Sequence, residues 1–190
     1  MRLHGRGGQG AVTAAQVLAA AAIEKGLYAQ AFPEFGAERR GAPVKAYTRI
    51  ADEVILEREP VVNPDIVLVL DSTLSPKIYM EGLKEGGVLV INTAKKPEEV
   101  LRELEEAGCR KPGTLVTVDA TSIALKLFRA PIVNTAMLGA LLKVLDVIDM
   151  DTLLKVIERK LAAKGRRIIE LNLQAIREAN ASAQVYKVSS

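Results

Sequence analysis

The sequence is poor in the residues on which disulfides and many metal sites depend. Its 190 residues include one cysteine, Cys109, one histidine, His4, and no tryptophan. A lone cysteine cannot form an internal disulfide, and no basic segment followed by an apolar stretch precedes the first glycines, as a secretory signal would require. We therefore expect a cytoplasmic protein with no metal site of its own.

A strong net charge and long apolar runs are also missing. The 26 lysines and arginines are nearly balanced by 23 aspartates and glutamates, which leaves a net charge of +3. That excess is too small for a nucleic-acid footprint, and the aromatic residues, 4% of the chain, do not alternate with basic ones as a stacking surface would. The apolar runs stop well short of the roughly 20 residues that cross a bilayer. We expect neither nucleic acid nor a membrane as a partner.

What the chain does contain is enough apolar sequence for one folded domain. The proportions of 49% hydrophobic and 26% charged residues exclude a disordered chain. A chain of this length buries about 70% of its unfolded surface in one core. No internal repeat, low-complexity linker or change in composition divides it, so we expect a single domain over residues 1–190, with residues 182–190 as a tail.

The first third of the chain predicts a helix, a strand and an irregular hairpin. After a short apolar start, small and apolar residues at helical spacing predict a helix over residues 11–25. A strand over 27–32, a loop over 33–43 and extended segments over 44–50 and 54–59 follow. The two extended segments are expected to pair around a turn at residues 51–53.

The rest of the chain predicts alternating strands and helices, and then helices alone. Apolar strands at 66–70, 88–91 and 115–118, with helices at 76–84 and 97–107 between them, are typical of parallel strands buried on both faces. Further helices are expected at 121–128, 135–147, 151–163 and 167–181. We therefore predict a single three-layer α/β domain with a mainly parallel sheet, an irregular hairpin insertion and a helical C-terminal third.

The most informative motif is a glycine-rich loop that opens directly into the first helix. It consists of Gly5, Arg6, Gly7, Gly8, Gln9 and Gly10. Backbone N–H groups at the start of the helix should point out of this loop, and no Ser, Asp or Asn is placed to cap them. The first turn, residues 11–14, also lacks an acid that would complement the positive end of the helix dipole. We expect the loop to meet negative charge from outside the segment.

Two other interpretations of the loop stay open. Glycines at positions 5, 7 and 10 match the dinucleotide fingerprint of a free-standing NAD-binding dehydrogenase module. Such a site needs an acid at the end of the second strand to hold a ribose, and the nearest acid, Glu34, follows Pro33 in a loop of different character. In the third interpretation the glycines only form a tight turn in a structural scaffold.

A second segment, residues 32–43, combines aromatic and charged residues in one loop. It contains two phenylalanines, two glutamates and an arginine pair: Phe32, Phe35, Glu34, Glu38, Arg39 and Arg40. Aromatic residues and arginine are the preferred anchors of buried contacts, so we expect Phe32, Phe35 and Glu38 at an interface. The two arginines suit bidentate contacts to phosphate or carboxylate. The alternatives are phenylalanines that fold back onto the core and arginines that form exposed ion pairs with the two glutamates.

Four further residues fit structural roles better than chemical ones. His4 has no matching base or metal partner, so a hydrogen-bonded structural role is favoured. Asn134 is expected to cap a helix and Met137 to pack in the core, the alternative being that Asn134 reaches the crevice of the glycine loop. Cys109 has no second cysteine or cationic cluster beside it and is expected to be unreactive.

Several segments of the chain occur in an order and spacing typical of one family. They are residues 4–10, 32–43, 47–50, 63–65 and 134–140. Together they resemble the gamma subunit of the 2-oxoacid:ferredoxin oxidoreductases, and the similarity covers nearly the whole chain. The Gly-Ala-Glu-Arg-Arg-Gly-Ala-Pro stretch is more similar to the pyruvate and branched-chain members, so pyruvate is the first expected substrate and a 2-oxoisovalerate-specific homologue the alternative.

The resemblance implies a reaction to which this chain contributes only a part. The family oxidatively decarboxylates a 2-oxoacid on thiamine diphosphate, passes electrons through iron–sulfur clusters to ferredoxin, and hands the acyl group to coenzyme A. One cysteine cannot hold a four-cysteine cluster, and the Gly-Asp-Gly segment with paired asparagines expected of a thiamine diphosphate and magnesium site is absent. We therefore expect thiamine diphosphate, Mg and [4Fe-4S] clusters on partner subunits, and no catalytic residue in this chain.

The resemblance implies two roles for this chain: to pack against the other subunits of the enzyme and to contribute to the coenzyme A site. The expected partners are the alpha, beta and delta subunits of the same anaerobic enzyme, with ferredoxin reached indirectly. Coenzyme A carries a pyrophosphate and a ribose phosphate, which oriented amides and planar guanidinium groups would meet. We assign this contact to residues 5–10 together with Arg39 and Arg40.

Overall fold

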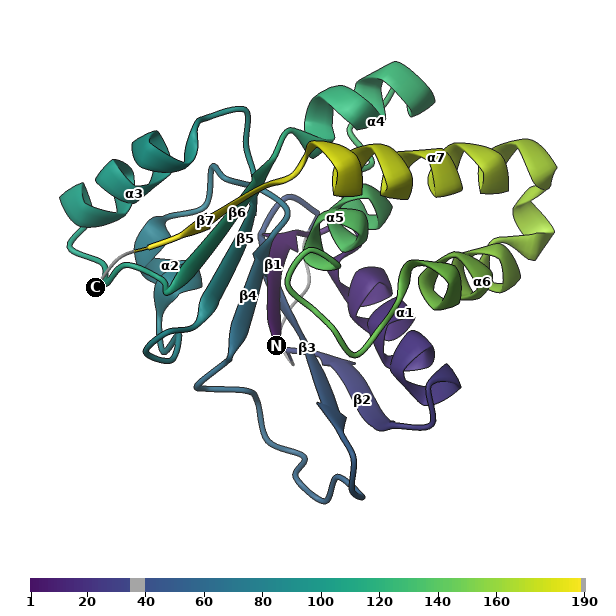
Figure 1. Cartoon of the computed structure of the whole chain (residues 1–190), viewed down its shortest axis with the longest axis horizontal. Helices are drawn as coiled ribbons and strands as arrows, with labels where there is room; N and C mark the ends of the chain where they lie inside the picture. Colours follow the sequence, from purple (N-terminus) through teal and green to yellow (C-terminus); the bar gives the residue numbers. More distant parts are fainter. Residues whose placement is uncertain (35–39, 189–190) are drawn as a thin grey trace.

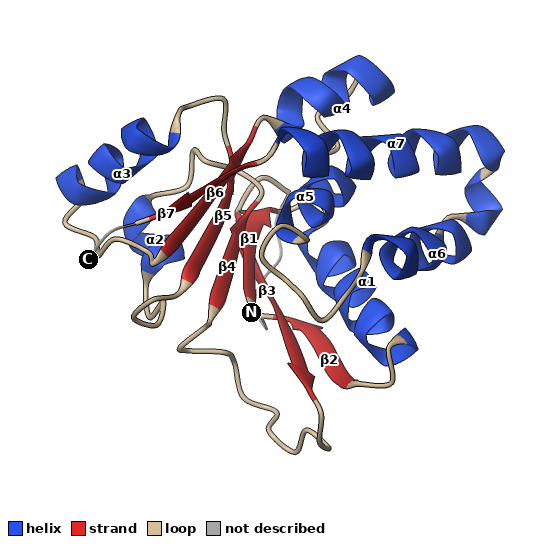
Figure 2. Cartoon of the chain, in the orientation of Figure 1, coloured by secondary structure: helices blue, strands red, loops and turns tan. Residues whose placement is uncertain are grey.

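A seven-stranded mixed sheet runs through the middle of the molecule, and helices cover both of its faces (Figures 1 and 2). The computed structural model describes residues 1–34 and 40–188. The strands are β1 (Arg2–Arg6), β2 (Tyr28–Pro33), β3 (Pro43–Ala51), β4 (Ile66–Val69), β5 (Val88–Asn92), β6 (Thr114–Val118) and β7 (Gln184–Lys187). Their order across the sheet is β2-β3-β1-β4-β5-β6-β7. The central strands β1, β4, β5 and β6 are parallel, whereas β3, β2 and β7 add to the two edges in antiparallel fashion.

The helices divide unequally between the two faces of the sheet. They are α1 (Ala11–Glu24), α2 (Pro76–Met80), α3 (Pro97–Glu106), α4 (Ala120–Phe128), α5 (Asn134–Leu141), α6 (Met150–Lys160) and α7 (Arg166–Ser182), with a 3₁₀ turn at Ala162–Lys164. Helices α2 and α3 lie on one face, and the larger group formed by α1, α4, α5, α6 and α7 lies on the other (Figure 1). The predicted three-layer α/β fold is therefore confirmed.

The apolar strands form two cores because successive side chains point to opposite faces of a sheet. In β4 and just beyond it, Leu68 and Leu70 pack with α1 and α5, whereas Val67 and Val69 pack with α2 and α3. The neighbouring strand repeats this alternation, with Val90 in the first core and Leu89 in the second. Burial on both faces explains why these strands are continuous apolar runs in the sequence.

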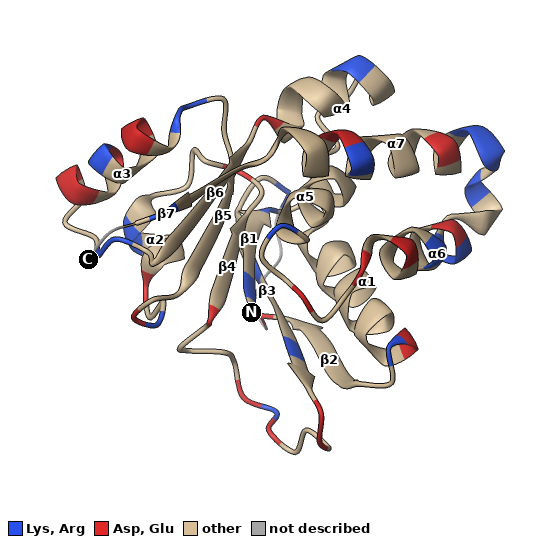
Figure 3. Cartoon of the chain, viewed as in Figure 1, with Lys and Arg blue, Asp and Glu red and all other residues tan. Residues whose placement is uncertain are grey.

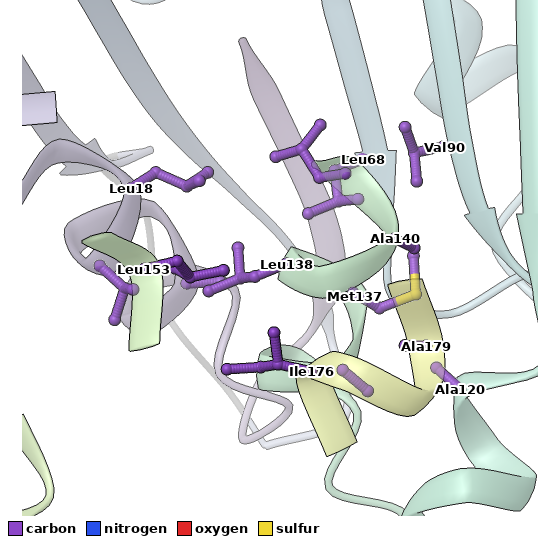
Figure 4. Close-up of a cluster of buried hydrophobic side chains, with 14 of the residues drawn as sticks. Leu18, Leu68, Val90, Ala120, Met137, Leu138, Ala140, Leu153, Ile176 and Ala179 are labelled. Carbon is purple, nitrogen blue, oxygen red and sulfur yellow. The ribbon is translucent and has the colours of Figure 1, made fainter. Parts of the chain in front are cut away.

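Helix α5 occupies the centre of the larger core. Met137 and Leu138 are fully buried (Figure 4), as the core role expected of Met137 requires. Gly139, in the middle of the helix, lies against α7 so closely that an added Cβ would overlap the carbonyl oxygen of Ile176. Asn180 of α7 donates a hydrogen bond of 2.9 Å to the carbonyl oxygen of Gly139. Glycine is needed here because the two helix backbones come too close for any side chain.

The expected hairpin at residues 44–59 is wrong in its second half. Residues 44–50 lie in β3, but residues 54–59 form no strand. The reason is that β3 lies between β1 and β2, so both of its edges are already hydrogen-bonded and a further strand has nothing to pair with. Val54 and Leu56 accordingly stay exposed.

The expected tail at residues 182–190 is also wrong in its described part. Residues 184–187 form β7, which pairs with β6 and covers what would otherwise be an open sheet edge. The sequence signal for this strand is weak because Val185 and Tyr186 are not buried and remain 44% and 37% exposed. Three helices end clearly earlier than expected: α2 at Met80 instead of residue 84, α5 at Leu141 instead of residue 147, and α6 at Lys160 instead of residue 163.

A buried arginine ties β1 to the loops around α2. Arg2 is 3% exposed, and its guanidinium group has no carboxylate partner within the described residues. It donates instead to the carbonyl oxygens of Val62, Tyr79 and Glu81 and, through Nε, to Nε2 of His4 at 2.8 Å. His4, 1% exposed, is thus a neutral acceptor, and burial together with the charge of Arg2 lowers its pKa from 6.5 to about 3. The structural role expected of His4 agrees with this geometry.

Among the helices that the structure describes, none is long and apolar enough to span a bilayer.

We expect Gly139→Ala to lower the free energy of unfolding by about 3 kcal/mol, because the methyl group forces α5 and α7 apart. The gain in helix propensity from alanine, about 1 kcal/mol, is too small to offset this. Urea unfolding followed by circular dichroism measures the change. In the control Gly108→Ala, the added Cβ meets open space and only the left-handed backbone, φ 71°, is strained, which costs about 1 kcal/mol. An equal loss in the two variants would contradict the close approach of the helices.

Acid should destabilise the protein partly through His4. The unfolded chain takes up a proton on this imidazole below pH 6.5, whereas the folded chain does so only near pH 3. Stability from this residue is therefore complete above pH 6.5 and falls by about 1.4 kcal/mol per pH unit below it. His4→Gln keeps an acceptor for Arg2 but does not titrate. Urea unfolding at pH 7.5 and pH 4.5 should show a loss about 2–3 kcal/mol smaller in the variant, and identical losses would exclude the mechanism.

Candidate functional site

The glycine loop connects the end of β1 to the first turn of α1, as expected from the sequence. The amide of Gln9 donates to the carbonyl oxygen of Arg6 at 3.0 Å, which closes the turn. Gly8 and Gly10 have left-handed backbones, with φ of 92° and 82°. A Cβ on Gly10 would also lie 2.5 Å from Nδ2 of Asn134, so the start of α5 packs directly on the loop. Glycine is required at position 10 both for its backbone and for this contact.

The N-terminus of α1 is left uncapped. No side chain of the helix start accepts a hydrogen bond from the first amides, and the first turn carries no acid. These amides line a hollow of about 290 Å³ together with the loop. Among the residues that the structure describes, no acid lines it; the lining consists of Arg6, Gly7, Gly8, Gly10, Ala11, Val12, Thr13 and Val44. Unsatisfied N–H groups, the helix dipole and the absence of carboxylates together make this hollow suitable for an anion.

A polar network braces the loop from the side of β4. Nε of Arg6 lies 3.1 Å from Oδ2 of Asp71, and the same oxygen accepts from the side-chain amide of Gln9 at 2.9 Å. Oε1 of Gln9 in turn accepts from the backbone N–H of Arg6 at 2.7 Å. Burial alone would raise the pKa of Asp71, but hydrogen bonds from Thr73 and Gln9 and the charge of Arg6 hold it below its ordinary value. The carboxylate therefore stays ionised and fixes both side chains.

The guanidinium group of Arg6 is largely occupied by this network. Its Nη1 donates to the carbonyl oxygen of Gly41 at 3.2 Å, and its Nη2 donates to Oγ1 of Thr73 at 2.9 Å. Three of its five N–H groups are therefore used inside the chain. Arg6 holds the loop in shape more than it reaches into the hollow.

The described end of the second segment lies beside the glycine loop. The amide of Gly7 donates to the carbonyl oxygen of Ala42 at 2.8 Å, and the amide of Gly41 donates to that of Gly7 at 3.1 Å. Arg40 forms an isolated parallel bridge with Gly7, and its side chain is exposed. The two segments that the sequence singled out are thus in contact at residues 40–42.

The remaining residues predicted in the second segment fall into two groups. Phe35, Glu38 and Arg39 lie outside the described residues. Phe32 is half-buried at the end of β2, where its ring lies 5.2 Å from that of Tyr47 and beneath the guanidinium group of Arg49. These contacts anchor Phe32 to its own sheet, and its predicted place at an interface stays a prediction.

A second cleft, which the sequence analysis missed, opens at the carboxyl ends of β4, β5 and β6. It has a volume of about 380 Å³, and Asp71, Asn92 and Asp119 contribute to its walls. Asn92 donates to the carbonyl oxygen of Leu70 at 2.9 Å and to Oγ1 of Thr121 at 3.0 Å. The signal that could have revealed it is a polar residue directly after each apolar strand, since such residues meet at one edge of a parallel sheet.

The other candidate residues have structural roles. Asn134 is the first residue of α5 and makes no capping hydrogen bond, so the expected cap is wrong and the alternative contact with the glycine loop is what the structure contains. Cys109 is partly buried against the core beneath α2 and α3. Over the described ranges, no three His, Cys, Asp or Glu residues gather in a way that could hold a metal ion.

Comparison with known proteins matches residues 1–182 to the family described as pyruvate ferredoxin/flavodoxin oxidoreductase. The chain is 46% identical over 189 residues to the "Pyruvate/ketoisovalerate oxidoreductases common subunit gamma" of Thermococcus kodakarensis, covering 99% of this chain and 98% of that protein. It is 46% identical over 178 residues to the "Pyruvate synthase subunit PorC" of Thermotoga maritima, covering 93% and 90% of the two chains.

A solved structure is similar to this chain over nearly its whole length. The crystal structure of the pyruvate oxidoreductase subunit PORC from Thermotoga maritima superposes with a TM-score of 0.83 and 41% sequence identity, covering 98% of this chain and 97% of that one. The resemblance drawn from the sequence motifs is therefore confirmed. The chain belongs to the pyruvate ferredoxin/flavodoxin oxidoreductase family, and within it to the gamma-type subunits.

Proposed function

We propose that this chain is the gamma subunit of a cytoplasmic pyruvate:ferredoxin oxidoreductase, which converts a 2-oxoacid to an acyl-CoA and reduces ferredoxin. Its near full-length similarity to gamma and PorC subunits supports the proposal. The alpha, beta and delta subunits would be its partners. The relative from Thermococcus kodakarensis is named as common to pyruvate and ketoisovalerate oxidoreductases, so we also infer that the partners, and not this subunit, select the 2-oxoacid.

The redox and decarboxylation cofactors fit the partner subunits better than this chain. A [4Fe-4S] cluster needs four cysteines, and the sequence has one. The resemblance implies that thiamine diphosphate is bound through magnesium at a Gly-Asp-Gly segment with paired asparagines, and the sequence contains no Gly-Asp-Gly. No step of the decarboxylation is therefore assigned to residues of this chain.

The observation that carries a coenzyme A role is the uncapped start of α1, which faces a hollow lined by no acid of residues 1–34 and 40–188. Coenzyme A supplies the thiol that takes up the acyl group, and its phosphates need hydrogen-bond donors. The amides of Gly8 and of residues 10–13 offer donors at the hollow that no side chain of the helix start satisfies, whereas the amide of Gln9 is used in the turn. Such fixed donors bind phosphate without having to reorganise.

Two arginines would assist these amides in different ways. Arg6 positions the loop, because Asp71, Thr73 and Gly41 hold its guanidinium group. The exposed side chain of Arg40 begins beside Gly7 and is free to turn toward a phosphate at the hollow. We retain Arg39 as a second candidate from the sequence alone.

A dinucleotide-binding dehydrogenase module is the weaker alternative. Its ribose would need the carboxylate of Glu34, which instead accepts a hydrogen bond of 2.9 Å from the hydroxyl of Tyr47 and lies 3.5 Å from Nζ of Lys45. That acid is already held by the sheet. Native mass spectrometry of the isolated chain with NAD separates the two functions, since only the dehydrogenase module binds NAD without partner subunits.

We expect Gly8→Asp to raise the apparent KM for coenzyme A in the assembled enzyme at least tenfold over Gly8→Asn. Gly8 lines the hollow, is exposed, and has open space where a Cβ would lie. Asp and Asn have the same shape and both tolerate a left-handed backbone, so the pair isolates the effect of negative charge near a phosphate. Steady-state rates at varied coenzyme A give the result. Equal KM values for the two variants would show that no phosphate of coenzyme A binds in this hollow.

Arg40→Ala should raise the same KM about tenfold with kcat nearly unchanged, because a charge-assisted contact contributes about 1.5 kcal/mol. The control is Arg58→Ala, another exposed arginine, outside the hollow. Assembly of each variant is checked by gel filtration before the assay. If the two variants gave the same KM, Arg40 would have no role in coenzyme A binding.

A further inference from the structure

A large apolar pocket lies on the helical side of the molecule, among α1, α4, α5, α6 and α7. Its volume is about 650 Å³, which makes it larger than either hollow beside the glycine loop. Val17, Leu138 and Ile157 form its buried floor. Ile132 and Ile168 stand at its mouth and remain 50% and 40% exposed. Branched apolar side chains in a concave, exposed position are typical of a surface that another molecule covers.

The charged residues of this pocket are all basic. They are Arg129, Lys160, Lys164 and Arg167, and no aspartate or glutamate in the described part of the chain lines the pocket. The turn between α6 and α7 is accordingly rich in Lys and Arg (Figure 3). Two neighbouring cations do have ion-pair partners: Arg159 is paired with Glu24, and Arg166 is paired with Glu170. Within residues 1–34 and 40–188, no ion pair involves any of the four pocket cations.

The occupant of such a pocket must be both apolar and acidic. An apolar partner without carboxylates would cover the four cations and leave them desolvated and unpaired. The cations also come from four separate places in the chain: Arg129 follows α4, Lys160 ends α6, Lys164 lies in the 3₁₀ turn and Arg167 is the second residue of α7. A single carboxylate reaches one or two of these positions, whereas a polypeptide with several acids can meet all of them.

We propose that this pocket docks an acidic, amphipathic segment of another subunit of the oxidoreductase complex. Apolar side chains of that segment cover Ile132 and Ile168, and its carboxylates pair with the surrounding cations. The inference rests on the proposed function, because it requires a multi-subunit enzyme. It concerns a different surface from the coenzyme A contact, since no residue of the glycine loop lines this pocket and the two linings share only Thr13.

The test uses the complex co-expressed with its partner subunits. We expect the double variant Lys164→Glu/Arg167→Glu, and separately Ile168→Asp, to weaken retention of this chain at least tenfold and to release it at lower salt. The matched control is Arg110→Glu, an exposed arginine beyond α3 on the opposite side of the sheet. Thermal unfolding of each isolated variant confirms that it folds, as expected for exposed positions.

The outcomes separate this inference from the function on which it depends. Retention of the wild-type chain with selective loss of the pocket variants supports docking, whatever the effect of Gly8→Asp on the KM for coenzyme A. Equal retention of pocket and control variants overturns docking but leaves the subunit assignment intact. Two other occupants would also overturn the inference. A second copy of this chain occupies the pocket if the isolated wild-type chain is a dimer that the pocket variants dissociate. A small fatty acid occupies it if native mass spectrometry with decanoate shows one bound molecule per wild-type chain and none in the pocket variants.

Discussion

The ion pair between Arg6 and Asp71 is the interaction on which the candidate site depends. It joins the end of β1 to the residue after β4, so the loop between β1 and α1 has one shape. Ion pairs near a surface contribute only about 0–1 kcal/mol to stability. The value of this pair is therefore geometric: with Gln9 it turns the glycine loop so that the first amides of α1 face a hollow instead of a carboxylate.

The core holds the rest of this arrangement in place. Helix α5 is buried along its length, packs on α7 through Gly139, and presents Asn134 to the glycine loop. On the opposite side of β1, Arg2 and His4 fasten the strand to the loops around α2. The loop is thus supported by rigid elements from several directions, which suits a site that must bind phosphate with little rearrangement. The same helices that form this support leave a basic, apolar pocket on their outer side.

The sequence predicted the fold where its signals were local and strong. Apolar runs at 66–70, 88–91 and 115–118 became the central parallel strands because burial on both faces leaves little choice of residue. The sequence did not predict elements whose structure depends on pairing with strands far away in the chain. Nothing within residues 54–59 reveals that both edges of β3 are taken, and nothing within 184–187 reveals that β6 needs a partner.

The candidate site was predictable to a similar extent. The glycine pattern and the missing cap are visible in ten consecutive residues, and the predicted coenzyme A contact already joined Arg40 to them. Asp71 and Asn92 could not be assigned because their meeting depends on strand order, and the pocket cations are spread over residues 129–167.

Hydrogen–deuterium exchange of the assembled complex tests the central claim most directly. Saturating coenzyme A should slow exchange of the amides of Gly8 and residues 10–13 at least tenfold, and unchanged exchange there would contradict the account.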